Sequence, residues 1–206
     1  MSQNNDDNNN YTEMIVNIID NQKKKQNLNG IDWSNSQFKN INDLVANNVG
    51  NVGELILNNI CNKVNIECNI DGSKTKLIGG GGIGDGYIKN KKCEVKTARL
   101  GNNLTFQHEL GEHPWNVEYM CFIDFTPDKV YLTIFPNFSK DYYETKGRTS
   151  EPYFKKSITR RKETSDENPG AFKLTINEDD LKKCENTIEL NTNTSNIHKF
   201  INDIIQ

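Results

Sequence analysis

The sequence lacks the features that would place it in a membrane or outside the cell. Its 206 residues contain no apolar run near the roughly 20 residues that a membrane-spanning helix needs. The first ten residues, MSQNNDDNNN, have neither a basic start nor an apolar core, so we expect no secretory signal peptide. We therefore expect a cytoplasmic protein with no membrane partner.

Cysteine is too sparse and too scattered for a metal or disulfide framework. The five cysteines, Cys61, Cys68, Cys93, Cys121 and Cys184, are odd in number and include no CxxC pair. Zinc ribbons need closely spaced pairs, and secreted disulfide frameworks prefer an even count. Because Cys93 and Cys121 lie in apolar stretches, we expect them to be buried as small hydrophobic side chains.

An overall positive charge is missing as well. The 25 Lys and Arg residues are outnumbered by 28 Asp and Glu residues, which gives a net charge of −3. A DNA-binding function therefore needs a local basic surface. The segment 146–162 supplies one, because it holds seven basic residues and one acidic residue, with Tyr153 and Phe154 between them. Such a strip suits a phosphate backbone, although charged runs are also common in solvated loops.

Apolar periodicity predicts a helical start, a series of strands and a helical end. Residues 1–10 are nearly all polar, so we expect a disordered tail there. Helices are predicted at 11–24, 41–64 and 196–205, and a short one after Asn177. Strands are predicted at 75–78, 83–89, 92–99, 104–107, 117–125, 130–135 and 172–176. This order indicates one domain over residues 11–206, of α/β (α+β) class, with a central mixed β-sheet flanked by helices.

The helix at 41–64 has the clearest pattern. Asn42 is a suitable cap for its start, and Gly50 and Gly53 create a weak point near Asn48. Its predicted apolar face consists of Leu44, Val45, Val52, Leu55, Ile56 and Ile60. Glu54 lies in the same segment.

Two motifs resemble known binding sites but have the wrong context. Residues 79–84 satisfy GxGxxG, yet a strand and turn follow where a dinucleotide site needs a helix, so no nucleotide cofactor is expected. We expect this glycine run to be a flexible loop that contacts DNA. His108 and His113 are one residue too far apart for a zinc-protease helix, and both are expected in surface loops.

A third motif is compatible with chemistry. Residues two apart in a strand share a face, so Glu94 and Lys96 point together, and the preceding strand can bring Asp85 beside Glu94. Paired carboxylates repel unless a cation lies between them, and a hard divalent ion such as Mg²⁺ relieves the repulsion. Lys96 is suited to orienting or deprotonating an attacking water. The alternative is an exposed strand on which Glu94 and Lys96 form an ion pair of about 0 to 1 kcal/mol.

These residues resemble the PD-(D/E)XK nuclease superfamily and, within it, the type II restriction endonucleases. Asp85 and the run Glu94-Val95-Lys96 match the core triad of that family, and Glu54 matches the acid on its preceding helix. The resemblance covers about residues 42–125. It implies that Asp85, Glu94, the Val95 carbonyl and Glu54 hold one or two Mg²⁺ ions, and that Lys96 positions the water.

The same resemblance implies a restriction-endonuclease-like core and a site-specific endonuclease. This enzyme would hydrolyse phosphodiester bonds of double-stranded DNA and leave 5′-phosphate and 3′-hydroxyl ends. By analogy, it would act as a homodimer on a palindromic site. Gly84 stands where the family usually has Pro. Predicted DNA contacts are Arg99, Gln107, Lys155, Lys156, Arg160, Arg161 and Lys162.

Two other functions remain open from the sequence. One is a repair or recombination nuclease on the same core, such as a junction resolvase. The other is a catalytically silent DNA-binding module, in which the carboxylates form a surface ion-pair cluster. The complete triad argues against the silent module, because such a module needs neither both acids nor the lysine.

Overall fold

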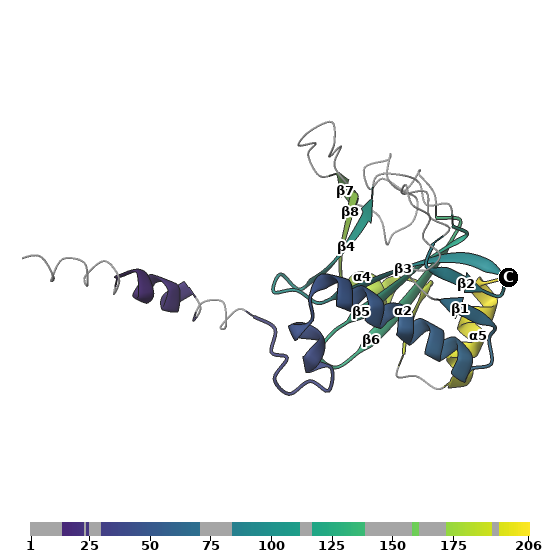
Figure 1. The fold of residues 1–206 in the computed structure, drawn as a ribbon, viewed down its shortest axis with the longest axis horizontal. Coiled ribbons are helices and arrows are strands. Elements are labelled where there is room, and N and C mark those ends of the chain that lie inside the picture. Colours follow the sequence, from purple (N-terminus) through teal and green to yellow (C-terminus); the bar gives the residue numbers. More distant parts are fainter. Residues whose placement is uncertain are drawn as a thin grey trace, which may run out of the picture.

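The computed structural model describes residues 14–22, 24, 30–70, 84–111, 117–138, 158–160, 172–190 and 194–206. Its helical elements are a helix over residues 14–22, the 3-10 helix η1 (Lys39–Asp43), α2 (Ala46–Lys63), α4 (Glu178–Lys183) and α5 (Thr194–Ile204). Its strands are β1 (Cys68–Ile70), β2 (Gly86–Ile88), β3 (Lys91–Arg99), β4 (Thr105–Gly111), β5 (Tyr119–Phe125), β6 (Val130–Pro136), β7 (Ile158–Arg160), β8 (Phe172–Asn177) and β9 (Thr187–Glu189). Figure 1 shows their arrangement.

The strands form two sheets. The larger sheet has the order β1-β2-β3-β5-β6-β9, and the smaller has the order β4-β8-β7. In the larger sheet β3 and β5 are parallel and the other neighbours are antiparallel. The predicted α/β class, with a mixed central sheet flanked by helices, is confirmed.

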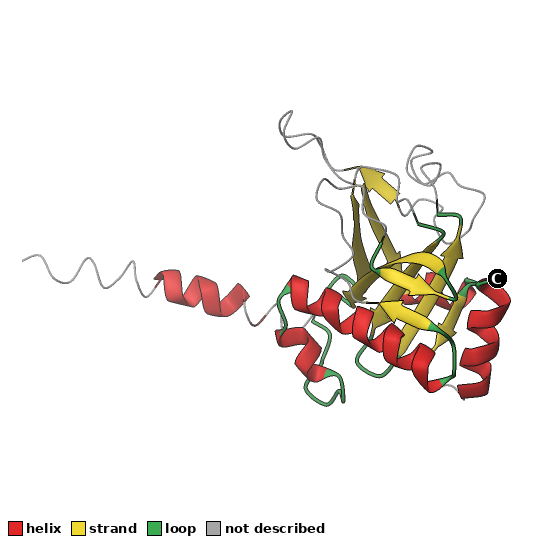
Figure 2. Ribbon diagram, turned by 45° about the vertical axis from the view of Figure 1, so that its right-hand side comes forward, coloured by secondary structure: helices red, strands yellow, loops and turns green. Residues whose placement is uncertain are grey.

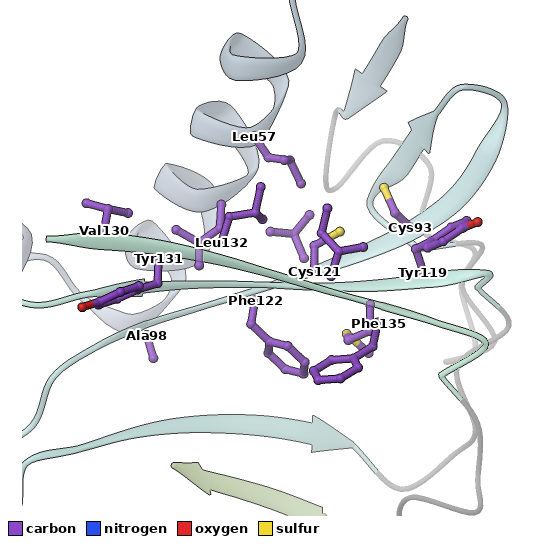
Figure 3. Packing of buried hydrophobic residues seen from close by; sticks show 14 of the residues in the cluster. Leu57, Cys93, Ala98, Tyr119, Cys121, Phe122, Val130, Tyr131, Leu132 and Phe135 are labelled. Atoms are coloured by element: carbon purple, nitrogen blue, oxygen red, sulfur yellow. The ribbon is translucent and has the colours of Figure 1, made fainter. Parts of the chain in front are cut away.

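The core lies on both faces of the larger sheet. Figure 3 shows Cys121 and Leu132 pointing toward Leu57 of α2, while Phe122 and Phe135 point toward the smaller sheet. Because both faces are covered, every residue of β5 is buried, which suits its nearly continuous apolar sequence. Cys93 and Cys121 are both fully buried, as predicted.

The predicted start of the long helix is wrong. Asn42 lies inside η1, and α2 begins at Ala46 with Val45 as its N-cap residue. Leu44 has an extended backbone, so the chain breaks between the two helices, earlier than the predicted weak point near Asn48. Neither glycine of α2 interrupts the helix.

The predicted apolar face of this helix is confirmed in part, because Leu44, Val52, Ile56 and Ile60 pack against the core. Val45 and Leu55 are 67% and 59% exposed, while the buried residues of α2 are Val49, Gly53, Leu57 and Cys61. A Cβ atom at Gly53 would lie 1.8 Å from Oγ1 of Thr97 in β3. The helix face that carries Gly53 therefore packs closely against β3.

Most of the other predicted elements are confirmed. The two hairpins β2–β3 and β5–β6 form as expected, and α5 matches the predicted terminal helix. Asn177 caps α4 in a capping box with Asp180. Strands β1, β7 and β9 were not predicted, and the expected strand at 75–78 and disordered tail at 1–10 lie outside the described residues. In the described part of the chain, no helix is both long and apolar enough to cross a membrane.

Candidate active site

The β2–β3 hairpin places Asp85 directly beside Glu94. Gly86 pairs with Cys93 in the hairpin register, so the residues that follow in the ladder are Asp85 and Glu94. The backbone N–H of Asp85 donates to the Cys93 carbonyl at 2.8 Å. Oδ2 of Asp85 accepts from the backbone N–H of Val95, also at 2.8 Å. These two bonds fix the Asp85 carboxylate against the edge of β3, where it is fully buried.

The backbone conformation at position 84, just before Asp85, explains why a glycine is found there. Gly84 has a φ of +88°, and a Cβ atom there would lie 2.2 Å from the Cys93 carbonyl oxygen. Proline has a fixed φ near −65° and is incompatible with this conformation. A glycine at position 84 therefore suits the observed backbone conformation, which a proline could not adopt.

Glu94 and Lys96 form a close ion pair on one face of β3. Lys96 Nζ lies 2.6 Å from Glu94 Oε1. The Glu94 side chain is 1% exposed, whereas that of Lys96 is 21% exposed. An ion pair on an exposed strand, the alternative considered above, does not describe a carboxylate that is buried to this degree. With Asp85 alongside, two carboxylates and one ammonium leave one net negative charge when all three are ionised.

The edge of β3 next to Asp85 is not paired with another described strand. The β2 ladder ends at the pair Gly86–Cys93, and within the described ranges no strand continues it along β3. The N–H of Val95 points to this edge, because it donates to Asp85. In an extended strand the carbonyl of the same residue points to the same side. The Val95 carbonyl and the Asp85 carboxylate therefore share one edge of the sheet.

Glu54 lies on α2, and it does not join Asp85 and Glu94 in a group of three described side chains that could hold a metal ion. Four residues further along the helix, Asn58 accepts a hydrogen bond from the N–H of Ile70 at 3.2 Å. Ile70 pairs with Gly86, the neighbour of Asp85. Because residues four apart share a helix face, Glu54 lies on the stripe of α2 that faces the β1–β2 side. The half-buried Glu54 is thus on the α2 side of the edge that carries Asp85.

The donor set of this site fits Mg²⁺ better than a transition metal. Among the described residues, no group of three or more His, Cys, Asp or Glu side chains is arranged as a ready metal centre. Zinc centres require three or four such protein ligands. Mg²⁺ instead takes one or two carboxylates and completes its shell with water and substrate phosphate oxygens. The adjacent buried carboxylates of Asp85 and Glu94 meet that requirement.

Two of the predicted DNA contacts, Arg99 and Gln107, line the same pocket. Gln107 is exposed on β4, and with Arg99 it lines a pocket of about 390 Å³ that also includes Asn102 and Asn103. Arg99 also has a structural role, because its Nη1 donates to two backbone carbonyls near η1, those of Ile41 and Leu44, at 2.6 and 3.0 Å. The guanidinium therefore fastens η1 to the end of β3.

The other predicted DNA contacts belong to the basic segment. Lys155, Lys156, Arg161 and Lys162 lie outside the described residues, as does the glycine run at 79–82. Of Arg160, the structure describes only the backbone, in β7. The predicted contacts of this segment with DNA therefore stay predictions.

The prediction that His108 lies in a surface loop is wrong. His108 is in β4, and its Nε2 lies 2.9 Å from Oδ1 of Asp124 in β5, with both side chains fully buried. Burial raises the pKa of the Asp124 carboxyl, although the neighbouring His108 opposes that shift. The alternation of Phe106, His108 and Leu110 was the available signal, since residues two apart share a strand face. His113 lies outside the described residues.

Comparison of the chain with protein-family models, curated proteins and solved structures found no match in any of the three. The protein is a mixed α/β protein with two adjacent buried carboxylates and a partly exposed lysine, at the part of β3 that no described strand pairs on the β2 side.

Proposed function

We propose that this protein is a Mg²⁺-dependent endonuclease of the PD-(D/E)XK type that cleaves double-stranded DNA at specific sites. The observation that carries the proposal is the β2–β3 hairpin, which holds Asp85 beside Glu94 and places Lys96 2.6 Å from the latter. The resemblance in sequence implies this arrangement, with an Asp on one strand and Glu-x-Lys on the next. A restriction-endonuclease-like core and a homodimer belong to the same proposal.

Burial supports a chemical role for the acids. Each carboxylate removed from water costs several kcal/mol unless other groups compensate it. A surface cluster of ion pairs would avoid that cost, but Asp85 and Glu94 are 0% and 1% exposed. The two buried carboxylates lie side by side, and Lys96 is bonded to one of them. A divalent cation would relieve the repulsion between the two acids, so its binding gives a reason for placing both at one site.

Each residue then has a distinct task. Asp85 and Glu94 would hold Mg²⁺, with the Val95 carbonyl as a further oxygen donor, and Glu54 on α2 would contribute through a water molecule. A bound Mg²⁺ lowers the pKa of a coordinated water and stabilises negative charge on the phosphate. The Lys96 ammonium, which is partly exposed, orients the attacking water and offsets the charge that develops on the phosphate.

Plasmid digestion with and without Mg²⁺ tests this function. We expect discrete bands with the wild-type protein and a loss of cleavage of at least about hundredfold in Asp85→Asn, Glu94→Gln and Lys96→Gln. The matched control is Lys129→Gln, which removes an ion pair of 3.0 Å with Glu189 outside the site and should cut normally. Nicks or smears in place of bands would favour a repair nuclease. A folded wild-type protein that cuts no unmodified, methylated or branched DNA would contradict the proposal.

A further inference from the structure

An apolar groove of about 490 Å³ lies beside α2, on the face of the larger sheet that this helix covers. One wall is a row on α2 with a spacing of four residues, Val52, Ile56 and Ile60. The remaining apolar lining comes from the η1 region, the end of the β5–β6 hairpin and the residue after β9, namely Phe38, Ile41, Leu44, Phe125, Val130 and Leu190. A row of residues four apart is the ridge with which one helix packs against another. The shape of the groove therefore suits the packing of a second helix against α2.

The chain itself contains a helix whose apolar side chains are exposed. In the helix over residues 14–22, Met14, Ile15, Val16, Ile18 and Ile19 are 47–58% exposed. Four of them, at positions 14, 15, 18 and 19, lie on one face. Figure 2 shows this helix standing apart from the sheets and from α2. An isolated helix of this length is marginal in water, so its stability depends on burying that face.

The connection between the helix and the groove is short. Ile31 packs against the core and Trp33 is buried, so the chain is anchored there. The seven residues from position 24 to Ile31 span at most about 23–25 Å when extended. The rim of the groove begins soon after, at Gln37 and Phe38. A linker of this kind gives an effective concentration in the millimolar range, which favours docking within one chain over pairing with a second copy.

We propose that the helix over residues 14–22 docks into the groove of its own chain as a second helix beside α2. Its Met14, Ile15, Ile18 and Ile19 side chains contact the row on α2 and the apolar floor. The arrangement in Figure 1, with this helix projecting from the body, is then the undocked state of the same chain. This docking does not depend on the nuclease function proposed above.

Backbone hydrogen exchange of the full-length protein tests the docking from the helix side. We expect the amides of residues 14–22 to be protected in a protein that sediments as a monomer. Ile18→Asp should raise their exchange rates by about tenfold or more, because it places a charge on the docked face. The matched control, Asn17→Asp, adds the same charge on the polar face and should keep the protection. Neither side chain is part of the core, so both variants should fold.

A second pair of variants tests the groove side. Val52→Asp places a charge in the groove and should remove the protection of residues 14–22, whereas Leu55→Asp, on the exposed face of the same helix, should not. Wild-type amides that exchange as fast as those of Ile18→Asp would overturn the proposal. Protection that appears only in a dimer and is lost on dilution would also overturn it, and would assign the groove to a second copy.

Discussion

Two buried carboxylates on the same face of the larger sheet are each paired with a basic side chain. Glu94 in β3 is bonded to Lys96, and Asp124 in β5 is bonded to His108. The register supports the common face, because Asp124 is paired with Ala98, which lies two residues from Lys96. The pairs differ in their access to water. Lys96 is 21% exposed, whereas His108 and Asp124 are fully enclosed between the two sheets.

This difference assigns different roles to similar residues. A long, partly exposed lysine beside a buried acid can reach a substrate at the edge of the sheet. An imidazole ring that is enclosed, and packed 4.8 Å from the ring of Phe122, cannot do so. The His108–Asp124 pair instead connects β4 of the smaller sheet to β5 of the larger one. Access to solvent, and not residue type, separates the candidate site from the structural pair.

The largest expected effect on stability comes from breaking the enclosed pair. His108→Ala leaves the Asp124 carboxylate buried without its partner, so we expect the free energy of unfolding to fall by about 3–5 kcal/mol. Lys96→Ala should cost much less, because its side chain reaches water. Urea unfolding of both variants measures the difference. Equal losses would show that the two pairs do not differ in the way proposed.

A smaller loss is expected from the turn that carries Asp85. Gly84→Ala introduces a Cβ atom at a positive φ and close to the Cys93 carbonyl, which should destabilise the protein by about 1–3 kcal/mol. The control is Gly50→Ala in α2, where no atom lies within 4 Å. That change should stabilise the helix by about 0.5–1 kcal/mol. Thermal unfolding of the two variants should therefore shift in opposite directions.

The enclosed pair should also give the protein a pH dependence of stability. Burial raises the pKa of Asp124, so between the ordinary value of 3.8 and the higher native value the native state holds a proton that the unfolded state has released. The resulting stabilisation is complete below the ordinary pKa of 3.8 and is lost as pH rises through the higher native value. Asp124→Asn should remove this loss. Urea unfolding at a series of pH values checks the prediction. If the free energy of unfolding of the wild type and of Asp124→Asn changes with pH in the same way, the prediction is contradicted.

Local patterns were sufficient to predict the elements that carry the candidate site. Alternation predicted β3, with Glu94 and Lys96 on one face, and the short turn predicted the hairpin that brings Asp85 alongside. The features that the sequence patterns did not predict depend on contacts between residues far apart in the chain. The buried face of α2 follows from the approach of Gly53 to Thr97, residues that are 44 positions apart in the sequence. The burial of His108 likewise depends on Asp124, which belongs to a different sheet.

Titration of the protein with Mg²⁺ by calorimetry is the most direct test of the acidic site, because it needs no knowledge of the DNA sequence that is cut. We predict saturable binding to the wild-type protein and a loss of affinity of at least about tenfold in both Asp85→Asn and Glu94→Gln. Asp124→Asn, which alters the enclosed carboxylate, should bind Mg²⁺ as the wild type does. A wild-type protein that binds no Mg²⁺, or an equal loss in Asp124→Asn, would contradict the assignment of Asp85 and Glu94 as the metal site.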